Sequence, residues 1–471
     1  MAAATKVIDR LKVGASPPAP GGTLPLTFFD VPWLFTGPVE RVFFYPYAHT
    51  AEHFFAAHLL PSLVSSLSAT LHAFYPLLGR VRPCPDGGDG GYEFFCSADG
   101  GEAVELTVAE SSDNFDELSG GGPRDVARLY ALVPQLPRPE ADGSFALAAA
   151  QVTVFPARGV AVGVSIHHVA CDDSSYMHFV KTWAARCREA ISGADAVPVP
   201  PPPPPFLDRG VVADPEGLAA RTLDEMRQLP ANGPPPPPPA PTGPPPKLVI
   251  ASFALTRDRI DGLKRRVAAM VAAGADGGTG RVHCSAFTVA CALAWACLAR
   301  AGGGGGGEER PRAHLLFSVE CRRRLAPPIP QEYLGNCLRP CFVEVGAAEL
   351  HGGDGVAAAA AAIGASVAGL DGGVLDGAGG WFHKILSLVP ERPMSLGGSP
   401  RYGVYETDFG LGRPAKVELV SIDKTPGTVS LAEGRDADAH AAGVEIGVVL
   451  PEAEMARFSS CFADALEELC D

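Results

Sequence analysis

Two histidines and two aspartates stand close together in the segment from Val160 to Ser175, where residue types and spacing could support catalysis. The run ending at His168 is rich in β-branched residues and reads as a buried strand. Because strand side chains alternate between faces, His168 shares one face with Val162, Val164 and Ile166. A histidine that ends an apolar stripe can be kept neutral, which a general base at neutral pH requires.

Spacing alone leaves other uses of this segment open. A histidine at a strand end is more often structural, and a side chain of the run Asp173 to Ser175 could cap the helix expected near Tyr176. His167 and His168, with the aspartates, also have the residue types of a metal site. Neighbouring strand residues point to opposite faces, so these two could hardly bind one ion, and we expect no metal. No serine here lies in a Gly-x-Ser-x-Gly sequence, which disfavours a serine nucleophile.

A proline-rich stretch divides the chain into two predicted domains, and the first of them contains this segment. The 471 residues contain 46 prolines, and 19 of these lie between Pro198 and Pro246. Proline fixes φ and removes a backbone donor, so residues 196–247 are expected to form an extended linker with one short helix around Leu218–Gln228. The predicted domains are residues 1–195 and 248–471.

Both halves mix helix and strand, which predicts an α/β fold without the regular alternation of a dinucleotide-binding domain. Expected strands and helices follow from apolar periodicity. The strands are Val104–Val108, Ala146–Phe155, Val160–His168, Lys247–Leu255, His314–Val319 and Val444–Leu450, and the helices are Phe54–Tyr75, Ser285–Arg300 and one starting near Pro451.

Composition excludes several classes of protein. The net charge of −15 argues against binding nucleic acid, which needs clustered Lys and Arg. The longest nearly apolar stretch, Cys284–Ala299, is shorter than the roughly 20 residues of a membrane span and reads as a buried helix. Twelve cysteines without a Cys-x-x-Cys pair, and a start that does not read as a secretory signal, indicate reduced thiols and a cytoplasmic protein.

Two motifs resemble those of the plant BAHD family of acyl-CoA-dependent acyltransferases. His168-Val-Ala-Cys-Asp172 matches the HxxxD motif of that family, and Asp408-Phe-Gly-Leu-Gly412 is similar to its DFGWG motif near the C-terminus. The segments Leu26–Asp30 with Pro32-Trp33, Phe74–Arg80 and Tyr333–Cys337 are also similar to the family. The last resembles the YFGNC signature of the branch that acylates anthocyanins and flavonoid glucosides.

The resemblance implies two chloramphenicol-acetyltransferase-like domains of similar size, joined by a crossover loop, with a reaction channel between them. It makes His168 the general base, and it makes Asp172 structural, paired with an arginine among Arg322, Arg323 and Arg324. Asp408, with Gly410 and Gly412, likewise takes a structural role. The co-substrate is expected to be malonyl-CoA or hydroxycinnamoyl-CoA and the acceptor a phenolic glycoside, with a monomeric enzyme and no permanently bound cofactor.

Two departures from the family pattern concern the same motifs. Asp173 stands where the family usually has glycine, and it could cap the helix or, with His167, lie beside the acceptor pocket. Leu411 replaces the tryptophan of DFGWG, which is expected to change packing rather than remove activity. Transfer to an amine or to an alcohol that is not a glycoside, and a non-catalytic binding relative, stay open as alternatives.

Overall fold

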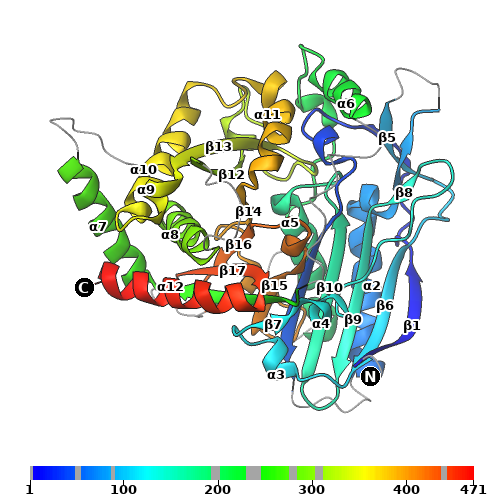
Figure 1. Ribbon diagram of the computed structural model, residues 1–471. Helices are drawn as coiled ribbons and strands as arrows, with labels where there is room; N and C mark the ends of the chain where they lie inside the picture. Colours follow the sequence, from blue (N-terminus) through cyan, green and yellow to red (C-terminus); the bar gives the residue numbers. More distant parts are fainter. Residues whose placement is uncertain are drawn as a thin grey trace.

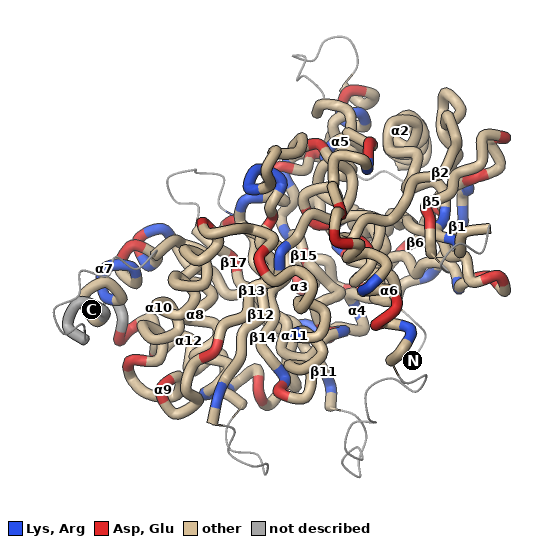
Figure 2. The backbone as a smooth tube through the Cα atoms, turned by 90° about the horizontal axis from the view of Figure 1, so that it is seen from above, with Lys and Arg blue, Asp and Glu red and all other residues tan. Residues whose placement is uncertain are grey.

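The computed structural model places the two halves of the chain side by side, with the N-terminal half on the right and most of the C-terminal half on the left in Figure 1. The structure describes residues 4–47, 55–85, 91–192, 202–229, 246–274, 284–302, 311–435 and 443–470. Acidic and basic residues are interspersed over both halves (Figure 2). The mixed α/β fold class predicted from the sequence is confirmed.

The N-terminal half is built on a six-stranded sheet. Its order is β1 (Thr5–Val13), β6 (Val104–Ser111), β9 (Ala148–Phe155), β10 (Gly159–His167), β3 (Pro38–Pro46) and β15 (Lys416–Leu419). The helices α2 (Leu60–Ala73) and α5 (Asp173–Ser192) pack on each other and share the core of this half. The Tyr176 hydroxyl of α5 donates to the carbonyl of Val164 over 2.9 Å, which fixes the helix on the strand that leads to His168.

A smaller four-stranded sheet flanks this half. Its order is β2 (Gly22–Pro25), β5 (Tyr92–Cys96), β4 (Arg80–Pro83) and β8 (Phe145–Ala146). Between β2 and β3 the chain makes the short helix η1 (Val31–Trp33). Short helices α3 (Phe115–Leu118) and α4 (Val126–Tyr130) follow β6.

The C-terminal half is built on a seven-stranded sheet. Its order is β13 (Leu338–Gly346), β12 (Arg312–Glu320), β14 (Met394–Gly398), β16 (Thr428–Glu433), β17 (Val444–Pro451), β11 (Leu248–Leu255) and β7 (Arg124–Asp125). The helices α7 (Arg257–Gly274), α10 (Gly355–Ala368) and α12 (Glu452–Cys470) pack around the central helix α8 (Ala286–Ala301). Shorter helices are α9 (Ala347–His351) and α11 (Trp381–Leu388).

The two halves exchange strands, which the sequence did not indicate. β15, from the C-terminal half, pairs with β3, and β7, from the N-terminal half, pairs with β11. Each exchanged strand carries buried charge: Arg124 of β7 contacts Glu418 of β15 over 2.7 Å, and Lys416 of β15 contacts Glu445 of β17. Because a buried charge is costly without its partner, these contacts tie the halves to each other.

The described part of residues 196–247 is packed, which differs from the extended spacer that was expected. The helix α6 (Leu218–Gln228) has the predicted bounds, and its Leu218 and Leu223 are buried. Phe206 forms a bridge with Tyr333 of the C-terminal half, and Arg209 is buried. Apolar and charged side chains between the proline runs therefore dock the connection on both halves; residues 193–201 and 230–245 lie outside the described residues.

Two apolar helices pack in the core of the C-terminal half. Helix α8, expected as Ser285–Arg300, has Ser285 as its N-cap and is buried over most of its length, as predicted. The segment Gly355–Gly372 is long and apolar enough to cross a membrane by composition alone. Its helix α10 packs against α8 and buries Val356, Ala359, Ala360 and Ile363, so in this fold it is a core helix.

Candidate active site

His168 is the first residue after β10, where the chain leaves the sheet before helix α5. Its imidazole stacks on the indole of Trp33 in η1, with ring centroids 3.7 Å apart and planes inclined by 4°. The side chain is half-buried. Trp33 thus covers one face of the ring and leaves the residue accessible elsewhere.

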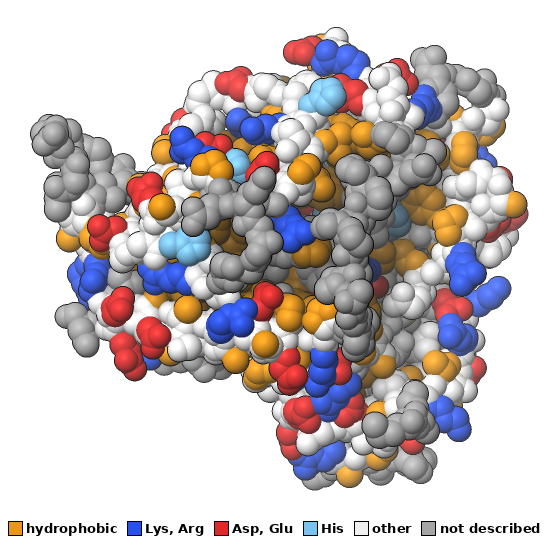
Figure 3. Space-filling model, in the orientation of Figure 1, with side chains coloured by type: hydrophobic (Ala, Val, Ile, Leu, Met, Phe, Trp, Pro, Cys, Tyr) orange, Lys and Arg blue, Asp and Glu red, His pale blue; other side chains and the backbone are white. Residues whose placement is uncertain are grey.

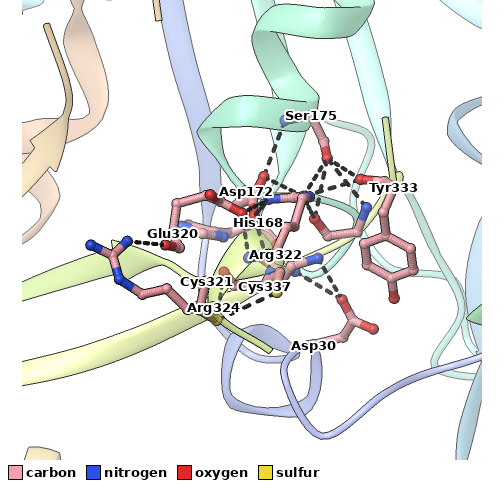
Figure 4. A network of polar contacts seen from close by, with 12 residues as sticks. Asp30, His168, Asp172, Ser175, Glu320, Cys321, Arg322, Arg324, Tyr333 and Cys337 are labelled. Atoms are coloured by element: carbon pink, nitrogen blue, oxygen red, sulfur yellow. Dashed lines mark hydrogen bonds and ion pairs between the residues drawn. The ribbon is translucent and has the colours of Figure 1, made fainter. Parts of the chain in front are cut away.

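The backbone at His168 is held from across the fold. Asn336 Nδ2 donates to the carbonyl oxygens of His168 and Val169, over 2.9 and 3.2 Å. The same amide donates to Asp30 Oδ1 over 3.0 Å, and so does the backbone N–H of Asn336. Asp30 in turn contacts Arg209 over 2.6 Å. Asp30, in the segment before Trp33, is therefore contacted by Arg209 of the linker and by Asn336 of the C-terminal half. Figure 4 shows Asp30 close to the polar network that includes His168, Asp172 and Arg322.

Asp172 points away from the imidazole and into a fully buried ion pair. Its two carboxylate oxygens accept from the Arg322 guanidinium over 2.8 and 3.0 Å. The same carboxylate accepts from the backbone N–H groups of Cys337 and Ser175. Four donors satisfy this carboxylate, and the bond to Ser175 makes Asp172 the N-cap of α5.

Among the three arginine candidates, the structure brings only Arg322 to Asp172. Arg322 is fully buried and also donates to the Ser175 hydroxyl and to the carbonyls of Tyr333 and Gly335, each within 3.1 Å. Arg323 and Arg324 are exposed. The three arginines share the short helix η6 (Arg322–Arg324), and only the first of them faces the interior.

Burial favours the neutral form of both imidazoles, those of His167 and His168, at pH 7. Burial lowers the pKa of His168, and the opposing influence of Asp173 and Asp172 does not restore it. Burial also lowers the pKa of His167 to about 4. The His167 ring packs on Phe145 with centroids 4.7 Å apart, so the two histidines have different surroundings. His167 therefore lies beside the site without sharing the pocket of His168.

Asp173 does not cap the helix, contrary to one of the two roles weighed for it. It is the first residue of α5 and forms two hydrogen bonds with Arg41 of β3, over 2.7 and 3.0 Å. Arg41 lies opposite Val164 in the sheet register, so it shares the face of the strand that carries Ile166 and leads to His168. A second ion pair thus stands next to the Asp172–Arg322 pair.

The Asp408 motif forms a tight loop away from His168. Asp408 Oδ1 accepts from the N–H groups of Gly410 and Gly412, both over 2.8 Å, and both glycines have positive φ. Phe409 is fully buried against Tyr45 and Trp183. Leu411 packs at the edge of the same core. The loop anchors a C-terminal segment on the N-terminal core.

Other chemistries find little support in this geometry. Within the ranges given above, no group of three or more His, Cys, Asp or Glu side chains is placed to hold a metal ion. Ser165 donates to the carbonyl of Pro134, and Ser175 is bound by Arg322, so both hydroxyls are committed to structure.

Sequence reasoning assigned no role to Trp33, Asp30, Asn336 or Arg209. Trp33, Asp30 and Asn336 lie in segments that resemble the family, Leu26–Asp30 with Pro32-Trp33 and Tyr333–Cys337. That resemblance was the only sign in the sequence that these residues contribute to the site. Arg209 lies in the linker, where the proline runs obscured it.

Comparison with known proteins places this site in a family. The family model described as the Transferase family matches residues 4–465. A malonyl-coenzyme A:anthocyanin 3-O-glucoside-6''-O-malonyltransferase of Dahlia pinnata is 32% identical, covering 98% of this chain and 97% of its own. A coumaroyl-CoA:anthocyanidin 3-O-glucoside-6''-O-coumaroyltransferase of Arabidopsis thaliana is 34% identical, with 98% of both chains covered.

Solved structures show the same fold at low sequence identity. Vinorine synthase superposes with a TM-score of 0.62 at 19% identity, covering 96% of each chain. TRI101 of F. sporotrichioides, complexed with coenzyme A and T-2, gives a TM-score of 0.63 at 15% identity, covering 93% of this chain and 97% of its own. The resemblance read from the HxxxD and DFGxG motifs is thereby confirmed. The chain belongs to the transferase family known as BAHD and is an acyl-CoA-dependent acyltransferase.

Proposed function

We propose that the enzyme transfers an acyl group from acyl-CoA to a hydroxyl of a flavonoid, anthocyanin or other phenolic glycoside, with His168 as the general base. The observation that carries the proposal is the environment of His168. A neutral, half-buried imidazole is stacked on Trp33, held at its backbone by Asn336, and followed by an aspartate that is fully engaged elsewhere. This is the arrangement that deprotonation of an alcohol at neutral pH requires.

The chemistry needs one proton acceptor and one leaving group. An acceptor hydroxyl is almost wholly protonated at pH 7, so His168 takes its proton as the oxygen attacks the thioester carbonyl. A C–O bond forms, the C–S bond breaks, and the CoA thiolate leaves and receives the proton from the imidazolium. Such a base typically accelerates a reaction by about 10²–10⁴-fold. In this scheme the thioester itself supplies the good leaving group.

Asp172 and Arg322 are proposed to position the imidazole of His168 and to take no part in proton transfer. Their ion pair fixes the first turn of α5 and the segment carrying Cys337 against each other. Because His168 lies only a few residues before Asp172, this pair determines where the imidazole stands relative to the C-terminal half. Asp408, Gly410 and Gly412 support the seam at a greater distance.

The two halves are proposed to act as domains whose seam is the reaction channel. Figure 3 shows a hollow near the middle of one face, where the halves meet, with hydrophobic side chains around its visible part. The assignment of domains to residues 1–195 and 248–471 is supported by the two main sheets and qualified by the exchange of β7 and β15. Buried charges at the exchanged strands hold the walls of this seam together.

The acceptor class is supported by the relatives. The names of the Dahlia and Arabidopsis proteins describe transfer to anthocyanin or anthocyanidin glucosides, and another Arabidopsis relative, 34% identical, is a phenolic glucoside malonyltransferase. The segment Tyr333-Leu-Gly-Asn-Cys337 supports the same branch, because it resembles the YFGNC signature of that branch.

We further propose a monomer that works in the cytoplasm without a resident cofactor. One chain supplies every residue of the network around His168 named above. Eleven cysteines whose side chains the structure describes carry free thiols, which suits a reducing compartment.

A donor-by-acceptor matrix tests the function. Purified protein is incubated with malonyl-CoA, p-coumaroyl-CoA or acetyl-CoA and with a flavonoid glucoside, its aglycone, a polyamine or shikimate, and products are identified by mass spectrometry. Acyl glucosides with release of CoA are expected. Acylation of the polyamine or shikimate alone would replace the proposed acceptor, and CoA binding without any product would contradict catalysis.

A further inference from the structure

A buried ion pair without a structural role assigned so far stands beside His168. The Arg41 guanidinium is 3% exposed and donates a hydrogen bond to each carboxylate oxygen of Asp173, whose side chain is 16% exposed. The ring of Tyr176 lies 5.0 Å from the same guanidinium. Burial alone would raise the pKa of the Asp173 carboxyl, but Arg41 outweighs it and the pKa is lowered, so the pair is ionised at pH 7.

The pair is placed near His168 from two sides: Arg41 lies opposite Val164, on the strand face that leads to His168, and Asp173 begins α5 five residues after His168. Asp173 influences the pKa of His168, and His168 influences that of Asp173. A base and the thioester carbonyl must approach the same acceptor oxygen during transfer. In malonyl-CoA a single methylene separates that carbonyl from the free carboxylate, so the carboxylate would have to lie in the immediate surroundings of His168.

The buried cations of the described residues are already neutralised. Their partners are known in every case: Arg41–Asp173, Arg124–Glu418, Arg209–Asp30, Arg322–Asp172 and Lys416–Glu445. A carboxylate that enters a partly dry site needs a cation of its own, since an unpaired buried charge is strongly disfavoured. Arg41 is a buried cation on the strand face that leads to His168, and Asp173 occupies its donors in a bidentate pair.

We propose that Asp173 determines the acyl donor: by closing Arg41 into an ion pair beside His168, it excludes the negatively charged malonyl group and leaves the site to neutral acyl-CoAs of the hydroxycinnamoyl type. This inference rests on the proposed acyltransferase function and decides between its two donor classes. Asp173 is a specificity-determining residue here and takes no part in proton transfer. Replacing it with a neutral side chain would free Arg41 for the carboxylate of a malonyl donor.

The test compares kcat/KM for p-coumaroyl-CoA and malonyl-CoA with one flavonoid glucoside as acceptor. Wild type is expected to favour p-coumaroyl-CoA at least tenfold. Asp173→Asn should raise kcat/KM for malonyl-CoA by about ten- to a hundredfold, the range of one charge-assisted hydrogen bond. The double variant Arg41→Met/Asp173→Asn should lose that gain while keeping p-coumaroyl transfer, and it removes both charges, so it should fold even if the single variant does not.

A matched control removes another ion pair of α5. Glu406→Gln breaks the exposed contact between Glu406 and Lys181, 2.8 Å long, and should leave the donor ratio unchanged. A wild-type enzyme that uses malonyl-CoA as well as p-coumaroyl-CoA would overturn the inference. So would a folded Asp173→Asn variant with no gain for malonyl-CoA. Failure of every donor to release CoA would instead refute the proposed function, and the inference with it.

Discussion

The imidazole of His168 lies flat against the indole of Trp33, with their centroids 3.7 Å apart. The two residues come from opposite ends of the N-terminal half, one in a short helix before β3 and the other just after β10. Stacking removes one face of the imidazole from water. Because water favours the protonated ring, this contact contributes to the lowered pKa that keeps His168 ready to accept a proton.

Removing the indole should therefore move the pH dependence of catalysis. In Trp33→Leu the imidazole gains solvent, and the pKa of His168 should rise towards its ordinary value of about 6.5. The acidic limb of the pH profile of kcat/KM then shifts to higher pH, because more of the base is protonated at a given pH. Trp381→Leu, in the separate helix α11, serves as the control and should leave the limb in place.

Breaking the Asp172–Arg322 pair from one side should destabilise the fold strongly. Asp172→Ala removes the buried carboxylate of this pair and leaves the Arg322 guanidinium with only the partly exposed Glu320, so the free energy of unfolding should fall by about 3–5 kcal/mol. Chemical denaturation measures this loss. The double variant Asp172→Ala/Arg322→Met should lose less than the sum of the single variants, and Arg324→Met, at an exposed position, should change stability by less than about 0.5 kcal/mol. Additive losses would show that the two side chains act independently.

His167 should make the folded state sensitive to mild acid. Its pKa is about 4 when folded and is ordinary, near 6.5, when unfolded, so the unfolded state binds the proton more readily. Stability is therefore complete above about pH 6.5 and falls as the pH drops towards 4, by up to about 3 kcal/mol. In His167→Gln this part of the pH dependence should vanish. An unchanged slope between pH 6.5 and 4 would refute the assignment.

The DFGxG loop should matter for stability through its phenylalanine rather than through its unusual leucine. Phe409→Ala removes a fully buried ring between Tyr45 and Trp183 and should cost about 3–5 kcal/mol of unfolding free energy. Leu411→Ala, at the edge of the core, should cost clearly less. Equal losses would mean that position 411 is as important for the seam as position 409.

Local sequence patterns predicted where strands and helices lie, but they did not predict which strands pair with each other. The strand expected at Val160–His168 is β10 (Gly159–His167), and the short helix at Leu218–Gln228 has the expected bounds, because periodicity and proline positions are local signals. The exchange of β7 and β15 could not be read, since β7 has only two residues and β15 only four. Pairing between distant strands leaves no periodic trace in either segment.

The same distinction holds for the site. His168 and Asp172 were identified from a strand pattern and a motif, and Arg322 was one of three adjacent candidates that only burial could separate. The roles of Trp33 and Asn336 depend on contacts between residues far apart in sequence. The cap of α5 was expected within Asp173 to Ser175 and lies instead at Asp172, because the helix begins earlier than expected and Asp173 is held by Arg41.

If His168 is the base in acyl transfer, the rate of CoA release should depend on its imidazole, and His168→Ala removes that imidazole. Wild type and variant are compared at pH 7.5 with saturating acyl-CoA and a flavonoid glucoside, after thermal denaturation has shown that both are folded. We expect the variant to lose about 10²–10⁴-fold in kcat. Turnover by the folded variant at the wild-type rate would contradict this expectation.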